Sequence, residues 1–344
     1  MAGGRRIVTL EEVARTSGVS RATASRALNG RARVSPEVRN RVRIVANAMG
    51  YRPNPAARSL ASGRSGALGL VIPTGHLVED PYAAHLVEAV AETATCHDQA
   101  LLLWLARVEP GPVVRNEFRT GLVDGLVISG VGFGAARIED LIDGPHPCVL
   151  IGRHPTRTDV ATIDLDNAAG ARAAVDHLIA TGARRVAIIT GPQERTDNQD
   201  RVQGYEDALA EHGLGLDGAL ARLGDFTVES GYEAMRQLLP AAPDAVFAAN
   251  DPMAVGALQA IREAGLRVPD DIVVAGFDDL PVAATTDPPL TTVRQDISLV
   301  GESAVEALVR LLDDDTTGPE RVVIPAPLVV RQTTGSGTGR GRGP

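Results

Sequence analysis

The apolar positions of the first thirty residues recur at helical spacing in two short segments. The first segment begins at Thr9, which can cap a helix, and Glu12 three residues later completes a capping box. The second begins near Ser20, whose hydroxyl can accept a bond from a free backbone N–H. The residues 16–19 between them form a short turn that contains Gly18. This spacing predicts a helix-turn-helix.

A third helix and a short fourth one follow. The third begins at Ser35-Pro36, an N-cap followed by proline at the first helical position, and Gly50 ends it. Prolines at positions 53 and 55 then give an extended entry, and Ala56 to Ala61 could form about two helical turns within a hinge segment of residues 54–62. So short a helix is marginal in water. We therefore expect this segment to become ordered only when something holds it.

From residue 66 the pattern changes to apolar runs of strand length that alternate with helical stretches. This alternation is typical of parallel α/β sheets. The pattern restarts near residue 185, which predicts two lobes of one architecture. The helix near residues 299–312 is followed by an alternating strand over residues 320–330. The predicted fold class is thus a small all-α helix-turn-helix head followed by a two-lobed α/β body, in which helices flank parallel sheets.

Charge separates the two parts of the chain. Residues 1–64 hold thirteen arginines and three glutamates, a net charge of +10. The whole chain carries −9, which leaves −19 for residues 65–344. A basic end on an acidic protein favours phosphate binding at that end. The alternative is a solvated basic tail, but such tails lack apolar periodicity, and here the arginines lie within it.

Composition excludes other classes of protein. The N-terminus has no apolar core of a signal peptide, and no apolar run is long enough to span a membrane. Cys96 and Cys148 lie far apart without metal-ligand spacing, and we expect both to be reduced core residues. We find no phosphate loop, nucleophile elbow or Cys/His cluster. The sequence indicates a cytoplasmic protein that is not an enzyme, has no membrane partner and uses no metal or cofactor.

The second predicted helix carries the chemistry of DNA recognition. Its exposed positions hold small, polar and cationic residues: Arg21, Ala22, Thr23 and Arg26. Such a surface at the N-terminal end of a helix suits insertion into the DNA major groove. The head is therefore predicted to bind double-stranded DNA.

Four blocks of sequence resemble one family. They are TLEEVARTSGVSRATASRALN, GYRPNPAARSL, AANDPMAVGALQAIREAGLRVPDDIVVAGFDD and PPLTTVRQD, and they occur in the order of the lactose-repressor (LacI/GalR) family. The resemblance implies a homodimer with paired heads, hinge helices and a body like periplasmic sugar-binding proteins. It predicts a head at residues 1–52, a hinge helix and linker at 53–65, and an effector-binding and dimerisation domain at 66–334, before a disordered tail at 335–344.

The resemblance assigns DNA contacts residue by residue. Arg21 and Ala22 match the positions that meet base edges, and Arg21 can bind a guanine in bidentate fashion. Leu60 matches the hinge leucine that wedges into the minor groove. The positions that anchor the head, mostly on phosphates, are Thr9, Ser20, Thr23, Arg26, Asn29 and Ser35. Those that flank the hinge leucine are Asn54, Ala57 and Arg58. Helix capping remains an alternative role for Ser20 and Ser35.

The effector site is predicted at the strand ends between the lobes, where open α/β sheets bind ligands. Arg201 matches the family arginine that forks onto ligand hydroxyls or carboxylates. An aromatic ring such as Phe226 can stack on a sugar or a purine. The full set of candidates is Asp80, Tyr82, Ser129, Asp197, Arg201, Phe226, Asn250, Asp278 and Gln295. Trp104 also comes near a strand end, either in the core or in the pocket.

The expected function is a DNA-binding transcriptional regulator, a repressor whose operator affinity is controlled by a small-molecule effector. A sugar inducer suits the Arg, Asn and Asp set, and a purine-like corepressor is the alternative that Phe226 allows. A cytosolic sugar-binding protein without a DNA role is a further alternative. A secreted sugar-binding protein would share the body but lack the basic head, and it would need an export signal. The sequence leaves open the identity of the effector and of the operator.

Overall fold

The structure is a computed structural model that describes residues 8–28, 34–52, 63–72, 81–105, 121–130, 135–313 and 318–335. The chain divides into two compact units, residues 1–65 and 66–344. Several predicted features lie outside the described residues: Asn29, Asn54, Ala57, Arg58, Leu60, Asp80, the hinge segment 54–62 and nearly all of the predicted tail.

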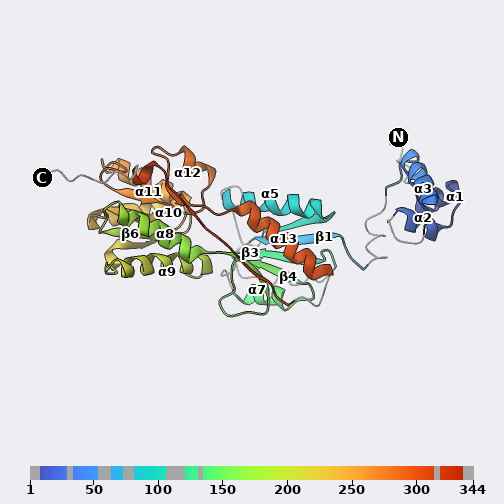
Figure 1. The fold of residues 1–344 in the computed structure, drawn as a ribbon, viewed down its shortest axis with the longest axis horizontal. Coiled ribbons are helices and arrows are strands. Elements are labelled where there is room, and N and C mark those ends of the chain that lie inside the picture. Colours follow the sequence, from blue (N-terminus) through green and yellow to red (C-terminus); the bar gives the residue numbers. More distant parts are fainter. Residues whose placement is uncertain are drawn as a thin grey trace, which may run out of the picture. The chain divides into compact units, whose positions relative to one another are not determined.

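In the first unit, the described residues 8–28 and 34–52 form three helices, which make up the head (Figure 1). Its helices are α1 (Leu10–Thr16), α2 (Arg21–Leu28) and α3 (Pro36–Ala48). Thr9 and Glu12 form the predicted capping box at α1. A small core holds the helices together through Val13, Ala14, Ala24, Ala27, Val42 and Ala46. The predicted helix-turn-helix and third helix are confirmed.

The first lobe of the body is built on a six-stranded parallel sheet with the order β11-β5-β4-β3-β1-β2. The strands are β1 (Ala67–Ile72), β2 (Ala100–Leu105), β3 (Gly125–Ser129), β4 (Cys148–Ile151), β5 (Ala161–Leu165) and β11 (Arg321–Ile324). Helices α5 (Pro81–Cys96) and α13 (Ile297–Asp313) pack side by side on one face of this sheet. Helix α7 (Ala135–Ile142) packs on the other face.

The second lobe repeats this architecture with four parallel strands in the order β7-β6-β8-β9. They are β6 (Val186–Thr190), β7 (Ala221–Leu223), β8 (Ala245–Ala248) and β9 (Val273–Ala275). One face is covered by α8 (Asn167–Ala180) and α9 (Thr196–Glu211), and the other by α10 (Val228–Leu238) and α11 (Asp251–Glu263). The short helix α12 (Pro281–Thr285) follows β9. The predicted two-lobed α/β body is confirmed.

Within the described residues, the chain crosses between the two lobes of the body three times (Figure 1). It leaves the first lobe between β5 and α8, returns after β10 (Thr292–Val293), and leaves again between β11 and β12 (Leu328–Val329). Strands β10 and β12 pair antiparallel with each other. The crossings place the ends of the parallel strands, and the side chains that follow them, close to the connecting segments.

Two expectations from the pattern are corrected. The single strand predicted over residues 320–330 is two strands, because Pro325 and Pro327 break the ladder and β11 and β12 pair in different sheets. Cys96 is exposed at the last residue of α5, whereas Cys148 is buried as expected. Trp104 packs, partly buried, against the core between the first sheet and α7.

Helices α10 and α11 pack closely against each other at two glycine residues, Gly231 and Gly256. A Cβ atom at Gly256 would lie 2.0 Å from the carbonyl oxygen of Val228 and 2.5 Å from the nitrogen of Tyr232. A Cβ atom at Gly231 would lie 2.2 Å from the carbonyl oxygen of Met253. The two helices therefore contact each other backbone to backbone. No helix among the described residues is both long and apolar enough to cross a membrane.

Candidate DNA-binding and effector-binding sites

The second helix of the head exposes the predicted recognition side chains. Arg21, Ala22 and Arg26 are exposed on α2, whereas Ala24 and Ala27 are buried against the other helices. The Nη1 atom of Arg21 lies 3.9 Å from a Glu11 carboxylate oxygen, and both side chains are more than two-thirds exposed. An exposed pair of this kind contributes little. The guanidinium of Arg21 is thus accessible to a base edge or a phosphate.

The hydroxyl groups of the head cap its helices. The Ser20 Oγ atom accepts a bond from the Thr23 backbone N–H at 3.1 Å and lies 2.9 Å from the Thr23 hydroxyl. The Ser35 Oγ atom accepts a bond from the Val38 N–H at 3.4 Å, and the Thr9 hydroxyl accepts one from Glu12. The capping alternative is therefore observed for Ser20 and Ser35, and their exposed positions leave room for a phosphate contact as well.

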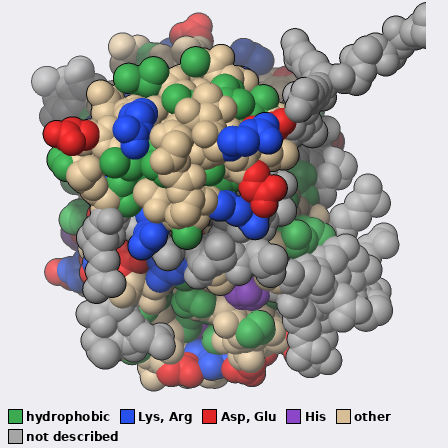
Figure 2. Space-filling view, turned by 90° about the vertical axis from the view of Figure 1, so that its right-hand side faces the viewer, with side chains coloured by type: hydrophobic (Ala, Val, Ile, Leu, Met, Phe, Trp, Pro, Cys, Tyr) green, Lys and Arg blue, Asp and Glu red, His purple; other side chains and the backbone are tan. Residues whose placement is uncertain are grey.

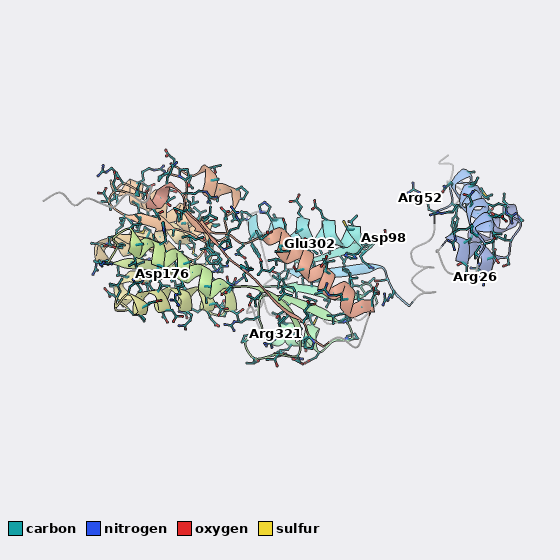
Figure 3. The ribbon with its side chains drawn as sticks, viewed as in Figure 1. Arg26, Arg52, Asp98, Asp176, Glu302 and Arg321 are labelled. Carbon is teal, nitrogen blue, oxygen red and sulfur yellow. The ribbon has the colours of Figure 1, made fainter. Side chains whose placement is uncertain are left out.

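Arginine side chains lie at several separate places on the face that Figure 2 draws. Figure 3 labels Arg26 and Arg52 on the head, and it labels Asp98, Asp176, Glu302 and Arg321 on the body.

The centre of the effector site is a buried ion pair in the second lobe. The Nη1 atom of Arg201, on α9, lies 3.4 Å from an Asp278 carboxylate oxygen, and the two side chains are 4% and 6% exposed. The same nitrogen donates to the carbonyl oxygen of Ala249 at 2.5 Å, and Nε donates to Asn167 Oδ1 at 3.0 Å. The guanidinium carbon lies 3.8 Å from the centre of the Phe277 ring. These contacts fix the orientation of the buried charge before any ligand arrives.

Asp278 is held in an unusual backbone conformation. Its φ angle is +114°, and Asp279 follows at +56°. A non-glycine residue in this region is strained, and such strain persists only where the surroundings hold it. The Gln295 side chain donates to the Asp278 carboxylate. Arg294 and Arg331 donate to the Asp279 carboxylate at 2.7 and 2.5 Å. Gln295 follows β10, so Asp278 is tied directly to the segment that returns to the first lobe.

Asp251 stabilises the turn that contains Asp278 and Asp279 through two buried hydrogen bonds. It is fully buried at the start of α11, and its carboxylate accepts bonds from the Leu280 N–H at 2.8 Å and the Thr292 hydroxyl at 2.5 Å. Burial, together with the nearby Asp278, raises the pKa of Asp251 well above its usual range. The residue joins the Asp278 turn to β10 and was not among the sequence candidates.

Asn250 and Phe226 are hydrogen-bonded to each other at the edge of the second lobe. The Asn250 Oδ1 atom caps α11 by accepting from Met253 N–H at 3.0 Å, and its Nδ2 donates to the carbonyl oxygen of Phe226 at 3.0 Å. Phe226 has a φ angle of +72°, and its half-buried ring lies against Gly191. A Cβ atom at position 191 would come within 2.2 Å of that ring, so only glycine fits beneath it.

The first-lobe candidates differ in their surroundings. Tyr82 lies at the start of α5, and burial raises the pKa of its hydroxyl. The charges of Arg195, Asp197 and Asp278 act on this hydroxyl, Arg195 most strongly, so Tyr82 faces the second lobe. Ser129 is buried at the end of β3.

The geometry therefore brings Tyr82, Asp197, Arg201, Asp278 and Gln295 together, with Asn250 and Phe226 at the edge. Sequence reasoning missed Asn167, Asp251 and Arg195. Asn167 follows the end of β5, so the strand-end rule that selected Ser129 could have found it. Among the described residues, no group of three or more His, Cys, Asp or Glu side chains could hold a metal ion.

Comparison with known proteins identifies the family. The model for bacterial regulatory proteins of the lacI family matches residues 9–54, and a periplasmic binding protein-like domain matches residues 175–334. The transcriptional regulator CelR of Thermobifida fusca is 37% identical over 340 residues, which cover 96% of this chain and 99% of CelR. The chain belongs to the LacI family. LacI-family proteins are DNA-binding transcriptional regulators and not enzymes, so the predicted class of function is confirmed.

Solved structures of the LacI family share the whole architecture. A CelR–cellobiose complex superposes with a TM-score of 0.74 at 34% identity, covering 95% of this chain and 99% of that one. The lac repressor dimer bound to operator and the anti-inducer ONPF gives a TM-score of 0.83 at 29% identity, covering 96% and 100%. The likeness extends over the head and both lobes.

Proposed function

We propose that this LacI-family protein is a cytoplasmic repressor that binds operator DNA as a homodimer and is released by a sugar. The observation that carries the proposal is the buried Arg201–Asp278 pair and its link through Gln295 to the segment returning to the first lobe. A polyhydroxylated ligand that bonds to these groups would act on that segment directly. It could thereby change the angle between the lobes and the spacing of the two hinge segments in a dimer.

The proposed DNA contacts rest on the exposure of α2 and on the charge of the head. Arg21 and Ala22 would meet base edges, and the other anchors of the head would meet phosphates. Leu60 and its neighbours lie outside the described residues, so their minor-groove role stays a prediction. The homodimer is tested by sedimentation, where a stable tetramer or a monomer on operator would contradict it.

Arg21→Ala tests base reading by the head. We expect it to cost about 1–3 kcal/mol at the cognate operator and little on random duplex, because a bidentate contact to a base edge is lost. Fluorescence anisotropy on both duplexes at one salt concentration measures this. Arg15→Ala removes the same charge from the exposed surface of α1 and is the control, expected to affect both duplexes equally. Equal losses for Arg21→Ala would leave it only a phosphate contact.

The effector is proposed to be a sugar because paired Arg, Asp and Gln side chains suit hydroxyl groups, and because the related CelR structure holds cellobiose. The half-buried ring of Phe226 favours a purine-like corepressor as the second candidate. The two predict opposite effects on operator binding. A sugar would weaken it, and a purine such as hypoxanthine or guanine would strengthen it.

Asp278→Asn tests the pocket while keeping the shape of the side chain. We expect operator affinity without effector to stay within about twofold and release by sugar to be lost, because the amide cannot pair with Arg201 or accept as strongly from ligand hydroxyls. Operator release during titration with cellobiose, maltose, lactose and their component sugars measures this. An unchanged response in the variant would remove Asp278 from the effector site.

A further inference from the structure

Asp279 is the neighbour of the effector-site aspartate, but its carboxylate contacts a different set of groups. One of its oxygens accepts from Arg331 Nη2 at 2.5 Å, and the other accepts from Arg294 Nε at 2.7 Å. The side chain of Asp279 is 8% exposed, so both bonds are largely shielded from water. Asp278, in contrast, pairs with Arg201. The two adjacent carboxylates therefore have different partners.

The two arginines belong to two different segments that connect the lobes. Arg294 follows β10, after which the chain returns to the first lobe, and Arg331 follows β12, after the third crossing. The connection that leads to β12 is the dark red segment that runs from one lobe to the other in Figure 1. The segments lie side by side, because β10 and β12 pair antiparallel and the Arg294 N–H donates to the carbonyl oxygen of Pro327 at 2.8 Å. One carboxylate thus bonds to both connecting segments.

The guanidinium and the backbone of Arg331 are both anchored in the second lobe. Its Nη1 atom donates to the carbonyl oxygen of Leu290 at 2.9 Å, and its backbone N–H donates to the Thr291 hydroxyl at 2.8 Å. The Thr291 hydroxyl in turn donates to the carbonyl oxygen of Arg331 at 3.1 Å. Because these bonds restrain the side chain, a displacement of the Asp279 carboxylate is passed on to the backbone of the segment.

Asp278 is held in place by bonds that do not involve the charge of Asp279. Its N–H donates to the carbonyl oxygen of Val293 at 2.8 Å, and its own carbonyl oxygen accepts from the Gln295 N–H at 3.1 Å. The φ angles of +114° and +56° at positions 278 and 279 belong to one turn, so the two residues move together. Asp279 therefore adds to this turn a bond to Arg331, and with it a contact to the third crossing.

We propose that Asp279 is a positioning residue that couples the effector site to both connecting segments, through Arg294 and Arg331, without itself touching the effector. A ligand that bonds to Asp278 shifts the turn, and the Asp279 carboxylate passes this shift to the two segments that join the lobes. This inference rests on the proposed effector response and adds the route by which that response leaves the site. Effector binding and operator release are then separable, because different side chains carry them.

Asp279→Asn and Arg331→Gln test this route from its two ends. Asparagine keeps the size of the side chain and tolerates a positive φ angle, so the first variant removes the charge without added strain. Asp271→Asn is the control. Asp271 also accepts from an arginine of the second lobe, Arg267 Nε at 3.3 Å, but it pairs within its own loop before β9.

Two measurements on the full chain separate binding from response. Calorimetric titration with cellobiose, maltose, lactose, hypoxanthine and guanine gives the affinity for each probe. Fluorescence anisotropy, with and without each probe, gives the affinity for a duplex that the wild-type protein selects from a random pool. Circular dichroism checks that each variant is folded. A residue with only a structural role would lower stability or probe affinity without uncoupling the two affinities.

We expect a saturating concentration of at least one probe to change the operator affinity of the wild-type protein by about tenfold or more. In Asp279→Asn and in Arg331→Gln this change should fall below about threefold, while the Kd for the same probe stays within about threefold of the wild-type value. Asp271→Asn should behave as the wild type does.

Three results would contradict the proposal. A full operator response in either variant would overturn the route through Asp279 and leave the effector in place. Loss of probe binding by folded Asp279→Asn would overturn it too, because Asp279 would then belong to the binding site itself. If no probe binds the wild-type protein, the proposed effector fails, and the route fails with it.

Discussion

Asp164 lies on β5, the strand from which the chain first leaves the first lobe. Burial raises the pKa of its carboxyl to about 6, and the nearby Asp200 and Asp197 act in the same direction. Its Oδ1 atom accepts a bond from the Leu165 N–H at 2.8 Å, and the attraction of Arg153 is too weak to offset burial. The folded state therefore opposes ionisation of this carboxyl, which stays protonated to a higher pH than in the unfolded chain.

Asp164→Asn should stabilise the protein at neutral pH. Between about pH 4 and pH 6 the folded state holds a proton on Asp164 that the unfolded state has lost, so the wild type loses stability as pH rises through this window. The amide cannot ionise and still accepts from Leu165. We expect a gain of about 1–2 kcal/mol at pH 7, reduced from the full shift by solvent screening, and no gain below about pH 4. Urea unfolding at several pH values measures it, and a pH-independent difference would contradict it.

The side chains of the effector site could be predicted only in part. Asn250 and Asp278 were found because each follows a strand, which is a local signal. Arg201 was found through the family resemblance, and it lies within α9 rather than at the start of the helix. Asp251 follows Asn250 at the start of α11 and carries the same local signal, but its role depends on partners on β10 and at Leu280, which come from distant parts of the chain. Asp278 also adopts a φ angle that no sequence rule assigns to aspartate.

Among the elements, the helices of the head were predictable because their caps are local. The capping box at α1 and the Ser35-Pro36 start of α3 involve residues that are neighbours in sequence. Strands β11 and β12 were not predictable as separate strands, because the structure divides the single apolar run of residues 320–330 between two sheets. The register with β5 and β10 is fixed by tertiary pairing, which the alternation of residues 320–330 does not reveal.

Gly256→Ala should destabilise the second lobe, since α10 must move to admit the added methyl group. We expect a loss of about 1–3 kcal/mol in the free energy of unfolding, the usual cost of overpacking. Gly215→Ala is the control, because a Cβ atom there has nothing within 4 Å. Denaturant unfolding followed by circular dichroism compares the two. An equal, small effect for both would mean that α10 and α11 separate without cost.

At the scale of the whole body, the Arg153–Asp200 salt bridge joins the lobes directly. Arg153 follows β4 of the first lobe, and its Nε and Nη2 atoms donate to the carboxylate of Asp200 on α9 at 2.9 and 2.6 Å. The carbonyl oxygen of Arg153 also accepts a bond from the Thr196 hydroxyl at 3.0 Å. A change in the angle between the lobes would have to stretch or break these contacts.

A double-mutant cycle on Arg153→Ala and Asp200→Ala should show coupling of about 0.5–1 kcal/mol, because the pair is bidentate but partly exposed. The pair Arg236 and Glu233 lies within one helix, is more exposed and should couple less. Unfolding free energies of the single and double variants give both values. Coupling near zero for Arg153 and Asp200 would show that this bridge does not hold the lobes together.

The triple crossing of the chain has a consequence for biosynthesis. The four strands of the second sheet lie within residues 186–275, so that sheet can form once this stretch has emerged from the ribosome. The first sheet lacks its edge strand β11, and one of its faces lacks α13, until residue 324 has been made. At ~5–20 residues per second, the interval after residue 165 is roughly 8–30 s. During that time the lobe that began first stays incomplete, with apolar surface open to chaperones and proteases, while the four-stranded sheet of the second lobe can form ahead of it.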